Sequence, residues 1–264
     1  MSTDLSIYHN AQMGSFASTV EVLLQHPLIT HKNSIQSNYK ISSLRHIYKG
    51  VGINAITMGP LTAVQFAGFG YFNNITKNIF KQEHHRSIIS STIAGALSGL
   101  IAGPAELFIV QQQKHNNKFL ESYRNVRNKY GISRCFRGTL PCIFRESIYT
   151  CGYCSLTPLI EQKLINYSPN HFKQKSIKTS LTASIVAGLV SGSVSHPFDT
   201  IKTYTQSHVN KKPKPLIKNA IKKEGISFLF KGIIPRSIRI VGTFFIFNEC
   251  SKFYINSIYP LIKN

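Results

Sequence analysis

The sequence predicts an all-α membrane protein that consists of three similar repeats. Two observations lead to this prediction: long runs without charge alternate with basic clusters, and the same short landmarks recur in each third of the 264 residues. The chain carries 31 Lys+Arg against 10 Asp+Glu, yet only 16% of its residues are charged. So strong a basic excess suits a polyanion, which is either an anionic membrane surface or a nucleic acid. The uncharged runs favour the membrane.

A membrane-spanning helix needs roughly 20 mainly apolar residues, and six runs are candidates. Residues 50–72 hold no charge, residues 87–110 hold only Glu106, and residues 179–201 hold only Asp199. The weaker candidates, interrupted by charge, are 10–30, 139–160 and 236–258. The mean hydropathy is close to zero, which is expected of helices that line a watery cavity with one polar face. The alternative is a soluble protein with long core helices, but the scattered glycines and serines argue against it.

Each third of the chain contains a proline late in an apolar run and a glutamine nine residues further on. Proline kinks a helix because it lacks an N–H and clashes with the preceding turn. An aromatic-basic-glycine element follows, whose glycine comes 23, 34 and 35 residues after the three prolines. We therefore expect repeats at 1–84, 85–174 and 175–264. The landmarks are Pro27, Pro104, Pro197, Gln36, Gln113, Gln206 and the elements that end at Gly50, Gly138 and Gly232.

The third repeat reads PFDTIK at residues 197–202, with an acid two and a base five residues after the proline. With this motif, P-x-[DE]-x-x-[KR], and its tripled context, nearly the whole chain resembles the mitochondrial carrier family. The resemblance implies six transmembrane helices in three pseudo-symmetric repeats around a central cavity, with short matrix-side helices. It implies a multi-pass transporter of the mitochondrial inner membrane that moves a small metabolite by alternating access. No enzyme activity, cofactor, metal or nucleic acid is expected, and the resemblance implies a monomer that binds anionic phospholipid such as cardiolipin.

In the family, the charges after the prolines pair around a ring and close the matrix side of the cavity. The three acid positions here are Ile29, Glu106 and Asp199, and the three base positions are Lys32, Ile109 and Lys202. The resemblance implies that Glu106 pairs with Lys202 and that Asp199 pairs with Lys32. Both members of the third pair, Ile29 and Ile109, are apolar, so no buried charge is left without a partner.

The three glutamines match the family's braces, which hydrogen-bond beneath these ion pairs. Taken alone, three glutamines at helix ends would instead face lipid headgroups, but their constant spacing from the prolines favours braces. Two glycine pairs, Gly95/Gly99 and Gly188/Gly192, are spaced for close helix contact.

The expected substrate contacts stand seven residues after each element's glycine: Thr57, Arg145 and Arg239. An arginine binds carboxylate or phosphate with two donors, and Glu146 beside Arg145 is suited to a substrate cation. The resemblance therefore favours an amino acid or a carnitine-like zwitterion as the substrate. Two alternatives stay open at this point: a nucleotide or other anionic metabolite, and a structural Arg145–Glu146 pair. The cytoplasmic-side motif of the family is missing, which leaves a non-transporting receptor or scaffold as a further alternative.

Overall fold

The computed structural model describes residues 6–37, 47–48, 51–115, 117–174 and 176–260. These residues form helices joined by short turns, and the described part of the chain contains no strand. The elements are α1 (Ile7–Ser37), α3 (Val51–Ile75), η1 (Thr76–Asn78), α4 (Glu83–His115), α5 (Phe119–Tyr130), η2 (Ile132–Phe136), α6 (Thr139–Cys151), η3 (Gly152–Leu156), α7 (Thr157–Tyr167), α8 (Ile177–Ser207), α9 (Pro213–Glu224), η4 (Ile226–Phe230), α10 (Ile233–Phe253) and η5 (Tyr254–Ile258).

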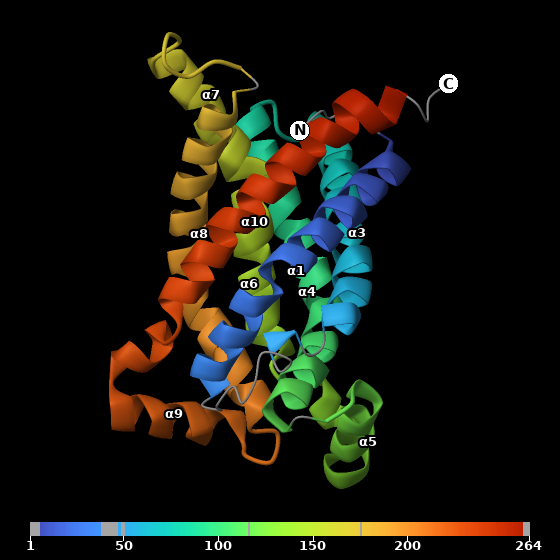
Figure 1. The fold of residues 1–264 in the computed structure, drawn as a ribbon, viewed down its shortest axis with the longest axis vertical. Coiled ribbons are helices and arrows are strands. Elements are labelled where there is room, and N and C mark those ends of the chain that lie inside the picture. Colours follow the sequence, from blue (N-terminus) through green and yellow to red (C-terminus); the bar gives the residue numbers. More distant parts are fainter. Residues whose placement is uncertain (1–5, 38–46, 49–50, 116, 175, 261–264) are drawn as a thin grey trace.

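The long helices run between two ends of the molecule (Figure 1). α1 begins and α10 ends at the top of this view, whereas α5 and α9 lie at the bottom. α1 packs against α3, α4 against α6, and α8 against α10. Contacts of α3 with α4, α6 with α8, and α10 with α1 join these pairs into a ring.

Each predicted apolar run lies within a helical segment, apart from Gly50, which is outside the described residues. The run 139–160 is shared by α6, the π-helix η3 and α7, and the run 236–258 continues from α10 into the π-helix η5. Within the described ranges, α4 and α8 are the two helices long and apolar enough to span a membrane. That the other four runs also span it stays a prediction.

Two features of the repeats have local physical causes. Gly138 and Gly232 have φ of 79° and 76° and directly precede α6 and α10. Only glycine adopts this left-handed conformation readily. The predicted close approach of α4 and α6 is confirmed, since a Cβ at Gly95 would lie 2.5 Å from the carbonyl oxygen of Glu146, and one at Gly99 would lie 2.6 Å from Ile143 Cα. The equivalent contact of α8 with α10 is looser, because a Cβ at Gly188 would lie 3.1 Å from its nearest neighbour.

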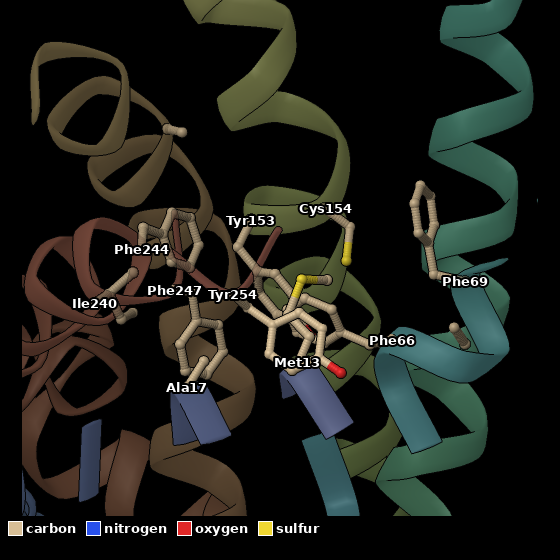
Figure 2. Packing of buried hydrophobic residues seen from close by; sticks show 12 residues of the cluster. Met13, Ala17, Phe66, Phe69, Tyr153, Cys154, Ile240, Phe244, Phe247 and Tyr254 are labelled. Carbon is tan, nitrogen blue, oxygen red and sulfur yellow. The ribbon is translucent and has the colours of Figure 1, made fainter. Parts of the chain in front are cut away.

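A cluster of aromatic side chains fills the centre of the circle of helices, near the end where α1 begins. We use the name aromatic cluster for Phe66, Tyr153, Phe244 and Phe247, whose buried rings come from α3, η3 and α10 (Figure 2). The ring of Tyr153 lies 5.2 Å from that of Phe247 and 5.5 Å from that of Phe66, centroid to centroid. Such contacts stabilise beyond simple apolar burial, so this end of the cavity is closed by packed rings.

Candidate functional site

The three prolines lie inside α1, α4 and α8, and the charged residues that follow them meet in the centre of the ring. Lys32 Nζ lies 3.2 Å from Asp199 Oδ2, and Lys202 Nζ lies 2.5 Å from Glu106 Oε2. All four side chains are buried. The two ion pairs predicted from the sequence are therefore confirmed, and they join α1 to α8 and α8 to α4.

The third position of this ring of pairs is apolar, as expected. Ile29 and Ile109 are both buried and line one small cavity. A direct hydrogen bond joins α1 to α4 one turn further on, where Asn33 Nδ2 donates to Gln113 Oε1 over 2.6 Å. Asn33 was not expected from the sequence. Its place four residues after Ile29, on the same helix face, is the signal that could have identified it.

The glutamines differ from one another in their bonds. Gln36 Nε2 donates to Asp199 Oδ2 at 2.9 Å, as a brace beneath the Lys32–Asp199 pair would. Gln113 bonds to Asn33 instead. Gln206 Nε2 donates to the backbone carbonyls of Gly103 and Arg137, at 2.9 and 3.3 Å. Gln36 therefore lies as a brace beneath one of the predicted ion pairs, whereas Gln206 holds backbone carbonyls of α4 and of the second element.

Arg137 belongs to the second aromatic-basic-glycine element, and it holds the end of α8. Its Nε donates to the carbonyl of Thr205 over 3.0 Å, and its Nη1 to that of Val209 over 3.2 Å. Burial lowers the pKa of this guanidinium from its ordinary value. In the third element Lys231 instead pairs with Glu224 at 2.5 Å on the surface.

Arg145 lies within the ring of ion pairs. Its Nη2 lies 2.8 Å from Glu106 Oε1, and it also pairs with Glu146, while its Nη1 lies 3.9 Å from Asp199. Glu106 therefore holds two cations, Lys202 and Arg145. The expected substrate contact is thus also part of the network of ion pairs.

Arg239 pairs with Glu21 at 2.9 Å, and the hydroxyl of Thr243 donates to the same carboxylate at 2.8 Å. Glu21 was not expected from the sequence. It is the one acid in the stretch that forms α1, and a lone acid in an apolar run is by itself a signal of function. Arg236, three residues before Arg239, lies 3.6 Å from Asp199 and was also missed.

The third expected contact, Thr57, lies on α3. Thr57 Oγ1 donates to the carbonyl of Asn54 in its own helix, and α3 presents Met58 to both cavities beside the charges. These cavities have volumes of about 30 and 40 Å³ and share Met58, Glu106, Arg145 and Arg239 in their walls. Ligand sites usually measure about 300–1,000 Å³, so a metabolite needs the helices to separate before it enters.

Seven acids and bases line the two cavities, and Asp199 and Arg236 join them through ion pairs. We call all nine the charge cluster: Glu21, Lys32, Glu106, Arg145, Glu146, Asp199, Lys202, Arg236 and Arg239. Counted formally, four carboxylates face five basic side chains, an excess of one positive charge. At the opposite end of the ring, Lys252 on α10 lies 3.4 Å from Glu161 on α7. This ion pair was not predicted, because no aromatic-acid motif marks it.

The described part of the chain contains no group of three or more His, Cys, Asp or Glu placed to hold a metal ion. Cys151 and Cys154 are free thiols, and Cys154 is buried beside the aromatic cluster. Acids and bases matched for ion pairing, around a cavity at the centre of a helical ring, suit reversible closure around a charged solute.

Comparison with known proteins agrees with this arrangement. A family model described as mitochondrial carrier protein matches residues 81–168 and 173–258. The 2-oxodicarboxylate carrier 1 of Saccharomyces cerevisiae is 26% identical over 76% of this chain and 68% of its own length. A probable 2-oxodicarboxylate carrier of Schizosaccharomyces pombe is 23% identical over 91% of this chain and 92% of its own. The aspartate-glutamate transporter of S. cerevisiae is 25% identical over 88% of this chain and 29% of its own length. The chain belongs to the mitochondrial carrier family, whose members are transporters and not enzymes.

Proposed function

We propose that this chain carries a small carboxylate metabolite across the mitochondrial inner membrane by alternating access. Six membrane-spanning helices would form three repeats at 1–84, 85–174 and 175–264, with the charge cluster as the matrix-side gate. The observation that carries the proposal is the position of Arg145. It lines both cavities and pairs with Glu106, so one side chain faces the solute and also holds the gate.

The charges favour a solute with both signs and a net charge of −1. Arg145 and Arg239 suit carboxylates, while Glu21 and Glu146 suit an ammonium group. Since the charge cluster has one cation in excess, a solute with two carboxylates and one ammonium would neutralise it. The relative named for aspartate and glutamate is consistent with this class. The resemblance to carnitine carriers stays a prediction.

The second candidate solute is a dicarboxylate without an ammonium group. Relatives named for 2-oxodicarboxylates, for succinate and fumarate, and for citrate favour it. Two negative charges would exceed the single uncompensated cation, so one acid of the cluster would have to take up a proton or move away.

Uptake by liposomes that contain the purified chain tests both. Glutamate and 2-oxoglutarate form a matched pair, because they differ at one carbon by an ammonium in place of a keto oxygen. We expect faster glutamate uptake and a selective loss of it in Glu146→Gln. Preference for 2-oxoglutarate would establish the dicarboxylate. Uptake of nucleotides alone would contradict both, and no uptake by folded protein would favour a receptor or scaffold.

A further inference from the structure

Gln65 on α3 lies between the charge cluster and the aromatic cluster and bonds to both. Its Nε2 donates to Glu146 Oε2 and to Ser98 Oγ, each over 2.9 Å, and its Oε1 accepts a bond of 2.7 Å from the hydroxyl of Tyr153. The side chain is only 1% exposed. Both amide atoms thus have buried partners, which fixes the orientation of the amide.

These bonds complete an unbroken path along the centre of the ring. From the gate, Lys202 bonds to Glu106, Glu106 to Arg145, and Arg145 to Glu146. Gln65 then joins Glu146 to Tyr153, whose ring packs against Phe244 and Phe247 (Figure 2). The path leads from the predicted matrix gate through the solute contacts to the packed rings.

Tyr153 is the second residue of the π-helix η3, which directly follows α6. Single π turns inside α-helices are uncommon and frequently mark functional sites. A Cβ at Gly152 would lie 2.7 Å from Phe244 Cζ, so this turn touches α10 closely. Gln65 therefore clamps two points on one helical segment, Glu146 before the π turn and Tyr153 within it.

We propose that Gln65 is a positioning residue that couples the charge cluster to the aromatic cluster. A change in the pairing of Glu106 or Arg145 moves Glu146, and Gln65 passes this movement to Tyr153 and the rings. The direction of the coupling, with one end closing as the other opens, rests on the proposed transport function. The existence of the coupling does not.

The thiol of Cys154 reports on the aromatic end, since it is buried next to Tyr153 in the same group of packed side chains. The rate at which a maleimide labels Cys154 in the purified full-length chain, followed by peptide mass spectrometry, measures how often this end opens. Glu106→Gln removes the carboxylate that pairs with Lys202 and Arg145, and so weakens the ion pairs at the other end of the path. Coupling energies of about 1–3 kcal/mol correspond to roughly 5–150-fold effects. We expect Glu106→Gln to slow Cys154 labelling at least about fivefold.

The decisive comparison repeats Glu106→Gln in three backgrounds. Two of these backgrounds are Gln65→Leu and Tyr153→Phe, the second of which deletes only the hydroxyl and keeps the ring. In both we expect the effect of Glu106→Gln on the Cys154 labelling rate to fall below about twofold. In Gln112→Leu, which removes a buried amide on α4 instead, the full effect of Glu106→Gln on Cys154 labelling should persist.

An undiminished effect in Gln65→Leu and Tyr153→Phe, or no effect in the otherwise unchanged chain, overturns the proposal. Liposome uptake is measured in parallel. A chain that transports nothing but shows the Gln65-dependent effect refutes the transport function and keeps the coupling.

Discussion

Asn33 and Gln113 join α1 to α4 by a hydrogen bond of 2.6 Å, next to the place where an ion pair would stand if Ile29 and Ile109 were charged. Ion pairs hold α8 to α1 and to α4, so among these three helices only the α1–α4 side lacks one of the predicted ion pairs. A neutral hydrogen bond contributes only about 0.5–1.5 kcal/mol. The α1–α4 side is therefore held by a neutral hydrogen bond where the other two sides have ion pairs.

Replacing Asn33 by leucine should loosen this side further. We expect the free energy of unfolding to fall by about 1 kcal/mol and the uptake rate to rise, because the gate opens more easily. Thermal unfolding and initial uptake rates measure the two effects. Gln162→Leu, an exposed glutamine on α7, is the control and should change neither; a slower uptake in Asn33→Leu would contradict the argument.

Ile29→Asp together with Ile109→Lys should create the third ion pair. Each single substitution leaves a buried charge unpaired and should cost about 3–5 kcal/mol, whereas the double variant should regain most of this loss. With three ion pairs the gate should open less often and uptake should slow. If the double variant is no more stable than the singles in thermal unfolding, the two side chains do not face each other.

The double variant Lys32→Asp, Asp199→Lys should regain only part of the uptake that either single reversal loses. The paired reversal recreates the Lys32–Asp199 attraction, but it places a lysine near Arg236, which lies 3.6 Å from the present carboxylate. Lys202 is also close, at 3.7 Å. We expect uptake above that of Asp199→Lys alone and clearly below that of the unchanged chain. Uptake as low as in either single variant would contradict the pairing as a functional unit.

Glu21 and Arg239 offer a way to separate stability from solute binding. Glu21→Gln or Arg239→Gln alone leaves one buried charge and should cost about 3–5 kcal/mol. The double variant should recover most of that stability, because two amides can hydrogen-bond to each other. It should still lose uptake, since no cation or carboxylate remains there for the solute. A stable double variant with unchanged uptake would exclude this pair from the solute site.

The sequence predicted the parts of the site that depend on register within one helix. The spacing after Pro197 places Asp199 and Lys202 on successive turns, so their direction follows from helix geometry. It could not predict that Arg145 reaches Glu106, because that contact depends on how closely α4 and α6 approach. The rotation of α3 about its own axis is set by its packing against α1 and α4, so the sequence could not predict that Met58 would line both cavities. Gln36 and Gln206 share one spacing, and each donates to the carbonyl of the basic residue of an element, Lys231 or Arg137, but Gln36 also donates to the Asp199 carboxylate.

Gly138→Ala tests the element that begins α6. Alanine would have to adopt a φ of 79°, and its Cβ would lie 3.0 Å from Gln206 Cγ, so strain and a displaced glutamine add together. Gly232 is a matched control, because its φ of 76° and ψ of 21° are close to the 79° and 8° of Gly138, but a Cβ there comes no nearer to another atom than 3.5 Å. Backbone strain alone costs about 1–3 kcal/mol. We expect Gly138→Ala to lower the free energy of unfolding by at least about 1 kcal/mol more than Gly232→Ala, with a larger loss of uptake because Gln206 and Arg137 hold α8 at this point. Equal losses in thermal unfolding would mean that Gln206 moves aside at no cost and that its bonds do not fix the end of α8.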